Sequence, residues 1–309
     1  MSSHPIAALD LGSNTFRLML AVRKGDLWAG KKVFQHIPRL SERLEPGGSL
    51  APEALTRAWE ALEDFAGLVR DSGAETVLAG ATMAARLAAD GPDFMAEIHR
   101  RYGWDTRILS GEEEACLTAT GVLTGLNPLP ENSLIFDIGG RSTEFISARG
   151  RAIRRSRSLA LGVVALTENH LSDPIESGQL QAVAEEVRAV LKSADFSDAE
   201  DSRVLAGTAG TVTTIAALLL ELRDYDPDKV NNANLGRKAI DSLLRDLAAL
   251  TVEQRVEQYG LHPRRADAIV AGLVEVLEIM DYFKRDEILV SDNGLLEGVW
   301  LRAAGLLER

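Results

Sequence analysis

Cysteine is almost absent from this chain. Cys116 is the single cysteine among 309 residues, which excludes a disulfide framework and a multi-cysteine zinc site. One thiol fits a reducing compartment, so we expect a cytoplasmic protein with Cys116 as a small core residue. No two of the five histidines lie at the spacing of metal ligands, and we assign them no chemistry.

Long apolar runs and an excess of basic charge are also lacking. The most apolar stretch, 206–222, is interrupted by glycines, threonines and Glu221, so it does not predict a membrane span. The N-terminus lacks the basic region and apolar run of a signal peptide. The net charge of −12 argues against non-specific nucleic-acid binding, which needs a basic face. We therefore expect a soluble protein with no membrane or nucleic-acid partner.

The length predicts two domains. A chain of 309 residues exceeds the size at which one hydrophobic core usually keeps growing. Glycine, asparagine and proline cluster between Gly125 and Pro130, which indicates a boundary. We expect an N-terminal domain at 1–125 and a C-terminal domain at 126–309, and the last helix, about 295–309, is a candidate to pack back on the first domain.

Strand and helix patterns alternate in both halves, which places the chain in the α/β class. Period-two alternation and short apolar runs predict strands, and apolar positions at helical spacing predict helices. The predicted strands are 6–11, 16–23, 27–34, 76–79, 106–109, 134–137, 143–148, 204–206 and 288–290. The predicted helices are 52–72, 93–102, 112–124, 179–192, 211–222, 239–250, a short one capped by Thr251 and Gln254, 264–283, and one from Leu295. The long apolar helix at 264–283 would serve a core or a homodimer interface equally well.

The second half of the chain repeats a sequence pattern found near the start of the first half. Residues 9–16 and 136–143 both read apolar, Asp, aliphatic, Gly, small residue. Such weak internal symmetry is expected of two duplicated domains.

The two glycine turns of this repeat are candidate phosphate sites. Without a Cβ, a glycine turn exposes backbone N–H groups and lets a phosphate approach closely. Asp10 and Asp137 precede the turns and would bind the Mg²⁺ that accompanies phosphate. One such turn alone would favour an ordinary hairpin, but two with the same aspartate offset favour phosphate. The turn residues concerned are Gly12, Ser13 and Asn14, and Gly139, Gly140, Arg141 and Ser142.

A third glycine cluster lies between a predicted strand and a predicted helix. Gly207, Thr208 and Gly210 would place N–H donors and the positive end of a helix dipole where an anion binds. The alternative is simply a close strand-to-helix turn, and the cluster gains weight from the other two.

Three carboxylates open the helix predicted at 112–124. Favourable interaction with the helix dipole would by itself account for acidic residues there. Ser110 and Glu113 satisfy the capping-box pattern, which gives Glu113 a structural role. Glu114 has no such local role, so we nominate it as the general base for a hydrolytic water.

Arginine occurs at two notable places. Arg86 follows a strand and a turn, where its guanidinium would offset charge on a transferring phosphoryl group; taken alone, a solvated helix residue is the simpler interpretation. Five arginines fall between 149 and 157, which would form either a track for a long anion or an exposed, soluble strand.

These motifs together resemble the exopolyphosphatase and guanosine pentaphosphate phosphohydrolase family. The resemblance rests on residues 8–16, 110–115, 136–144, 207–211 and 291–298, and it spans nearly the whole chain. It implies two actin-like (ribonuclease H-like) domains with mixed five-stranded sheets flanked by helices, and an active site in the interdomain cleft.

The resemblance also implies residue roles. Glu114 matches the catalytic glutamate and Arg86 the cleft arginine of the family, while Asn14, Asp137, Gly139, Ser142 and Glu144 match positions used for phosphate and Mg²⁺. The implied mechanism is in-line attack by a Glu114-activated water on the terminal phosphorus. The expected substrate is inorganic polyphosphate. The alternatives are guanosine pentaphosphate, and phosphotransfer by an ATP-dependent sugar or acetate kinase of the same superfold.

The chain departs from the family in two respects. Arg141 stands where the family usually has a third glycine, so either φ stays negative there or the side chain joins the site as an extra phosphate ligand. Longer relatives carry further C-terminal helical domains, so we expect lower processivity from a chain of this length.

Overall fold

The computed structural model describes residues 4–199 and 201–307. The chain divides into two compact units, 1–121 with 294–309, and 122–293, whereas the sequence prediction divided it after residue 125. Residues 1–3, on which part of the signal-peptide prediction rests, and 308–309, at the end of the predicted last helix, lie outside the described residues.

The first unit is built on a five-stranded mixed sheet of order β3-β2-β1-β4-β5. Its strands are β1 (Ile6–Leu11), β2 (Phe16–Lys24), β3 (Leu27–His36), β4 (Thr76–Ala81) and β5 (Asp105–Ile108). The first three are antiparallel, and β4 and β5 run parallel to β1. The predicted five-stranded mixed sheet is confirmed.

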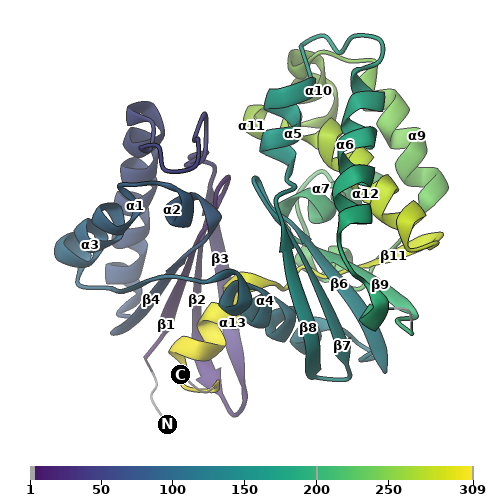
Figure 1. Cartoon of the computed structure of the whole chain (residues 1–309). Helices are drawn as coiled ribbons and strands as arrows, with labels where there is room; N and C mark the ends of the chain where they lie inside the picture. Colours follow the sequence, from purple (N-terminus) through teal and green to yellow (C-terminus); the bar gives the residue numbers. More distant parts are fainter. Residues whose placement is uncertain (1–3, 200, 308–309) are drawn as a thin grey trace. The chain divides into compact units, whose positions relative to one another are not determined.

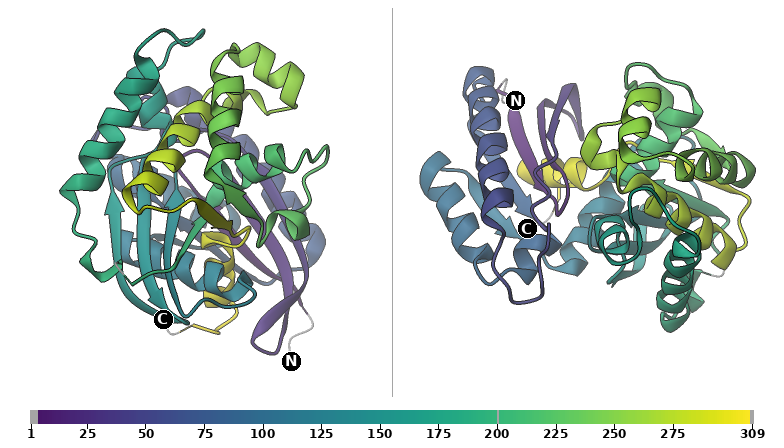
Figure 2. Two further views of the ribbon diagram at one scale, coloured as in Figure 1. Left: turned by 90° about the vertical axis from the view of Figure 1, so that its right-hand side faces the viewer. Right: turned by 90° about the horizontal axis from the view of Figure 1, so that it is seen from above.

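Successive residues of β1 serve opposite faces of this sheet, because side chains alternate along a strand. Ala7, Leu9 and Leu11 join a core with α1 (Pro52–Ser72) and α3 (Gly91–Tyr102), and α1 runs alongside the strands in Figure 2. Ile6 and Ala8 instead pack with α13 (Leu295–Ala303), the yellow helix beside the first sheet in Figure 1.

The second unit has a six-stranded sheet of order β10-β11-β9-β6-β7-β8. Its strands are β6 (Asn132–Ile138), β7 (Thr143–Arg149), β8 (Ala152–Leu159), β9 (Val204–Thr208), β10 (Asn234–Gly236) and β11 (Glu287–Val290). The order β8-β7-β6-β9-β11 repeats that of the first sheet, with the same strand directions. The prediction of five strands is wrong here, because β10 adds an antiparallel edge strand.

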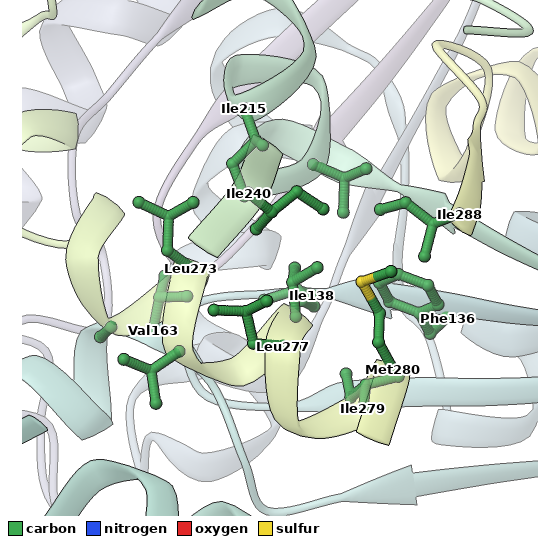
Figure 3. Close-up of a cluster of buried hydrophobic side chains, with 14 of the residues drawn as sticks. Phe136, Ile138, Val163, Ile215, Ile240, Leu273, Leu277, Ile279, Met280 and Ile288 are labelled. Atoms are coloured by element: carbon green, nitrogen blue, oxygen red, sulfur yellow. The ribbon is translucent and has the colours of Figure 1, made fainter. Parts of the chain in front are cut away.

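The remaining helices are α2 (Met83–Leu87), α4 (Gly111–Gly125), α5 (Val163–His170), α6 (Gln179–Ser193), α7 (Ala209–Leu219), α8 (Pro227–Val230), α9 (Arg237–Ala248), α10 (Val252–Tyr259), α11 (Pro263–Ala266) and α12 (Ile269–Tyr282), with a 3₁₀ turn at Ser197–Ala199. The helix predicted at 264–283 is two helices, α11 and α12. Figure 3 shows Leu273, Leu277 and Met280 of α12 among the apolar side chains of the second core. Because α12 is buried along nearly its whole length, it serves this core, and its sequence no longer indicates a dimer interface.

Two local predictions have opposite outcomes. The capping box at Thr251 is confirmed, since its hydroxyl accepts from Gln254 N and the Gln254 side chain accepts from Thr251 N. Cys116 was expected in a core, but it is exposed, because it lies on the outer side of α4 between buried Ala115 and Leu117. Among the described residues, the structure contains no helix of the length and apolarity that a membrane crossing requires.

Glycines allow close backbone contacts where α4 meets α13. A Cβ at Gly298 would overlap the carbonyl oxygen of Leu117, and one at Gly121 would overlap that of Gly294. Backbone atoms cannot rotate away as a long side chain can, so these contacts require glycine.

We expect Gly298→Ala to lower the free energy of unfolding by roughly 1–3 kcal/mol, the usual cost of overpacking. The matched control is Gly67→Ala in α1, where the nearest atom to a new Cβ is Arg70 Nη2 at 3.9 Å. That change should stabilise by about 0.5–1 kcal/mol, because alanine favours a helix interior. Urea unfolding of both variants measures this, and equal effects of the same sign would contradict it.

Candidate functional site

The segments that follow β1, β4 and β5 meet at the carboxyl ends of these strands in the first sheet. The carboxyl ends of neighbouring parallel strands lie together, and ligands commonly bind there in open α/β sheets. Thr82 N donates to Leu11 O at 3.3 Å, and Leu109 N donates to Ala81 O at 2.9 Å. The ends of β1, β4 and β5 are thereby held side by side, and each leads into predicted site residues.

The first glycine turn is closed by its own backbone. Gly12 N donates to Thr15 O at 3.1 Å, and a Cβ on Gly12 would lie only 2.8 Å from the same oxygen. Gly12 does not have a positive φ, so glycine is needed here for the close approach. The Asn14 side-chain oxygen is buried and has no hydrogen-bond partner among the described residues, which leaves an acceptor for a bound water or cation.

Ser13 connects this turn to α2, the helix that carries Arg86. Its hydroxyl accepts from Ala84 N at 3.1 Å, in the first turn of α2. A helix N-terminus leaves its first N–H groups without intrahelical partners, and a serine oxygen satisfies one of them. The Ser13 side chain therefore fixes α2, in addition to any ligand contact of the turn.

Arg86 and Glu114 are brought into direct contact. Arg86 Nη1 donates to Glu114 Oε2 and to Leu109 O, both at 2.6 Å. The side chains are 20% and 9% exposed, respectively. A guanidinium that donates to a carboxylate fixes its orientation, so the structure brings together two residues that the sequence nominated separately.

Glu113 has the structural role that the sequence predicted. Glu113 N donates to Ser110 Oγ at 3.1 Å, and Ser110 N donates to Glu113 Oε2 at 3.0 Å, which completes the capping box of α4. The Ser110 N–H and the Arg302 guanidinium hold the pKa of the Glu113 carboxyl below its usual range. Glu114 takes no part in this cap.

Asp10 has a partner, Arg17, that was not predicted. Arg17 donates to Asp10 Oδ2 through Nε at 3.1 Å and Nη2 at 2.8 Å, and the two residues face each other across the hairpin. Burial raises the pKa of the Asp10 carboxyl, and Arg17 partly offsets this. On the same face of the sheet, Glu297 is held by Lys31 at 2.8 Å. One oxygen of the predicted metal ligand Asp10 is thus occupied by a guanidinium.

The second unit repeats the turn closure. Gly139 N donates to Ser142 O at 2.9 Å, and a Cβ on Gly139 would lie 2.9 Å from that oxygen. Arg141 keeps a negative φ, which is the first of the two predicted alternatives for this position. Its guanidinium donates to Glu168 Oε2 of α5 at 2.7 Å.

Asp137 and Glu144 are direct partners across the β6–β7 hairpin, so their side chains share one face of the sheet. Glu144 is buried, and Ser158 Oγ donates to its Oε1 at 2.7 Å. Mg²⁺ prefers carboxylate oxygen and usually completes its shell with waters and substrate phosphate. Two carboxylates fit that pattern, although no group of three or more carboxylate, histidine or cysteine ligands occurs among residues 4–199 and 201–307.

The third glycine cluster lies beside the second turn, since Thr208 pairs with Asp137 in the parallel β6–β9 register. Gly207 is needed for packing, because a Cβ there would lie 2.6 Å from the Phe136 ring. Ala209 adopts φ 68°, a strained conformation for a residue other than glycine that is common at functional turns. Thr208 Oγ1 donates to Asn293 O at 2.9 Å, which connects this cluster to the motif at 291–298.

Arg265 of α11 is a further cation at this cluster. It donates to Gly210 O at 3.2 Å and to Thr214 Oγ1 at 2.5 Å. Arg265 was not predicted, because 55 residues separate it from Gly210 and no local pattern indicates such a contact. Arg17 carried a usable signal, since hairpin pairing places it opposite Asp10.

The five arginines between 149 and 157 do not form one continuous track. Arg149 pairs with Glu131 at 3.7 Å, and Arg155 pairs with Asp195 at 3.0 Å. Arg157 lies over the Phe196 ring, 5.0 Å from its centroid, and Arg151 donates to Leu123 O at 3.3 Å. A β-bulge interrupts the alternation between Arg155 and Ile153, so the exposed-strand interpretation describes this segment better.

Known proteins are similar to this chain in sequence and in fold. Residues 34–306 match the Ppx/GppA phosphatase family. The chain is 31% identical over 315 residues to exopolyphosphatase 2 of Mycobacterium tuberculosis, covering 97% of this chain and 98% of that protein. It is 29% identical over 304 residues to the guanosine-5'-triphosphate,3'-diphosphate pyrophosphatase of Aeromonas salmonicida, covering 97% of this chain and 59% of that protein.

A longer protein and two solved structures are also similar to this chain. The bifunctional 3-dehydroquinate synthase/phosphatase of Fusobacterium nucleatum is 30% identical over 309 residues, and the chain spans 46% of its length. The Ppx/GppA family member of Aquifex aeolicus superposes with a TM-score of 0.81 at 28% identity, covering 97% of both chains. An exopolyphosphatase-like protein superposes at 0.90 and 28% identity, covering 98% of this chain and 100% of that one.

We expect Ser13→Ala to lower the free energy of unfolding by about 1 kcal/mol, because Ala84 N–H loses its capping acceptor. Faster hydrogen exchange of the Ala84 amide and slower phosphate release should accompany this loss, since α2 carries Arg86. Ser72→Ala is the control, because its hydroxyl also accepts from a backbone amide, Ala74 N at 3.2 Å, at the far end of α1. Equal losses of phosphate release in both variants would contradict the role of Ser13.

Proposed function

Because the chain belongs to the Ppx/GppA phosphatase family, a family of hydrolases acting on phosphoanhydride bonds, we propose that it is an exopolyphosphatase. It removes the terminal phosphate of inorganic polyphosphate in the presence of Mg²⁺. The observation that carries this proposal is the contact between Arg86 and Glu114 at 2.6 Å. It places a fixed carboxylate and a guanidinium beside a glycine turn, which are the groups that hydrolysis of a phosphoanhydride requires.

Glu114 acts as the general base. Arg86 holds Glu114 Oε2, so the carboxylate keeps one orientation and accepts a proton from a water molecule. That water attacks the terminal phosphorus in line; the new P–O bond forms as the bridging P–O bond breaks, and the shortened polyphosphate leaves. General bases of this kind contribute about 10²–10⁴-fold to rate, and Arg86 offsets the negative charge on the transferring group.

Asp137 and Glu144 are the residues that would hold Mg²⁺. Both present carboxylate oxygens on one face of the second sheet, and Ser158 orients Glu144. When bound, the cation supplies charge neutralisation for the phosphate oxygens. Backbone N–H groups of the glycine turns contribute the uncharged part of phosphate binding.

Polyphosphate is favoured as the substrate by the relative that matches from end to end, the exopolyphosphatase of M. tuberculosis. Guanosine pentaphosphate is the second candidate, since the A. salmonicida relative named for it matches 97% of this chain. The net charge of −12 disfavours nucleic acid as a partner. We place the enzyme in the cytoplasm, in keeping with its single, unpaired cysteine.

Phosphate release with Mg²⁺ from polyphosphate, from guanosine pentaphosphate, and from ATP with and without sugars will identify the substrate. We expect polyphosphate to give the highest kcat/KM. A higher value with guanosine pentaphosphate would transfer the assignment to the second candidate. Sugar-dependent consumption of ATP would indicate a kinase and overturn the hydrolase assignment.

Glu114→Gln should lower kcat by about 10²–10⁴-fold, the usual contribution of a general base, because an amide cannot accept the proton. Its oxygen still accepts from Arg86, so the fold should be retained. Glu113→Gln is the matched control, because glutamine also completes a capping box, and it should keep kcat within a few-fold. Full phosphate release by Glu114→Gln would show that another group is the base.

A further inference from the structure

A carboxyl group lies buried directly beneath the second glycine turn. Glu275 of α12 is 0% exposed, and its Oε1 lies 2.5 Å from Thr143 Oγ1. Thr143 follows Ser142, which closes the turn, and precedes Glu144, a candidate Mg²⁺ ligand. The proposed reaction assigns no role to Glu275, and a carboxyl in the middle of an apolar helix has a cost unless its polar atoms are satisfied.

The Thr143 hydroxyl has two hydrogen-bond partners but only one proton to donate. The Thr143 hydroxyl also lies 2.8 Å from Leu161 O, and a carbonyl oxygen can only accept. A hydroxyl has a single proton to donate, but it can accept as well. Both hydrogen bonds form together only if Thr143 donates to Leu161 and the carboxyl of Glu275 donates to Thr143. This arrangement requires Glu275 to be protonated.

The charged surroundings favour the same state. The charged group that acts on Glu275 is another carboxylate, Glu144. The ion pairs near α12 involve other positions: Arg188 of α6 with Glu278, and Arg237 of α9 with Asp281. The charged residues of the other helices packed against α12 also have partners elsewhere. On α5, Glu168 pairs with Arg141 and His170 pairs with Glu186. Arg265 of α11 contacts Gly210, and α7 has no charged residue. Burial raises the pKa of Glu275 to about 8; the hydrogen bond with Thr143 offsets part of this increase, and the charge of Glu144 adds to it.

We propose that Glu275 is a positioning residue for the second turn. As a neutral carboxylic acid, Glu275 donates to Thr143, and Thr143 donates to Leu161 O. These two hydrogen bonds, the Glu275–Thr143–Leu161 relay, hold Ser142 and Glu144 in place. As a role in catalysis, this inference rests on the proposed phosphatase function. The protonated state of Glu275 does not rest on it. Loss of the proton would remove the donor and leave a negative charge that Glu144 repels.

Stability measurements test the protonated state without any substrate. A carboxyl whose pKa is raised from 4.5 to about 8 in the folded protein releases its proton on unfolding, so wild-type stability should fall as pH rises between those values. Glu275→Gln keeps a neutral donor and cannot titrate. We expect the difference in Tm between wild type and Glu275→Gln to change steadily from pH 5 to pH 8; a constant difference would overturn the assignment of the proton.

Turnover tests the positioning role. Glu275→Gln should retain kcat at pH 7 within a few-fold, because its amide donates to Thr143. Glu275→Leu should lower kcat by tenfold or more with a smaller change in KM, since displacement of a ligand by about 1 Å can cost up to about 10²-fold in rate. Wild type should also lose kcat above about pH 8, and Glu275→Gln should not. Equal kcat values for Glu275→Leu and Glu275→Gln would overturn the positioning role.

Variants of Thr143 keep the test decisive if Glu275→Leu does not fold. Thr143→Val removes the hydroxyl with little change in shape, and Thr143→Ser retains the hydroxyl. We expect Thr143→Val to lose kcat as Glu275→Leu does, and Thr143→Ser to retain it. Full kcat in Thr143→Val would contradict the relay. If polyphosphate is not hydrolysed at all, the proposed function fails, while the Tm comparison still decides the state of Glu275.

Discussion

The ion pair between Arg86 and Glu114 holds together the predicted site residues of the first unit. Its carboxylate is nearly buried, so without the guanidinium it would be a costly unpaired charge. The pair forms because β4 and β5 end side by side and because Arg86 also binds the carbonyl of Leu109, just after β5. Ser13 fixes the helix of one partner, and Ser110 with Glu113 fixes the helix of the other. One hydrogen bond between distant segments and one helix cap therefore support this charged contact.

Much of this arrangement was predictable from local sequence. The strands of both hairpins, the duplicated glycine turns and both capping boxes were predicted and are confirmed, because each depends on residues a few positions apart. Strand β10 was not predicted, because a strand of three residues is too short to show an alternating pattern. The break between α11 and α12 was missed because both segments fit one helical pattern.

Contacts between distant residues account for the rest of what sequence patterns did not reveal. Arg265 meets Gly210, and Glu275 meets Thr143, across 55 and 132 residues. Neither contact has a local signature, and each depends on how a helix packs against a sheet. Glu275 in particular breaks the apolar pattern of a core helix, and the pattern alone cannot say which polar group it will meet.

The two glycine turns are closed by main-chain atoms and by the absence of a Cβ, so the side chains that follow each glycine contribute nothing to the closure itself. The residues at those positions can therefore differ between the two turns without altering the closure. One turn has a serine and an asparagine at those positions, and the other has a glycine and an arginine. A substitution at either position can therefore change the groups that a turn offers to a ligand without opening the turn.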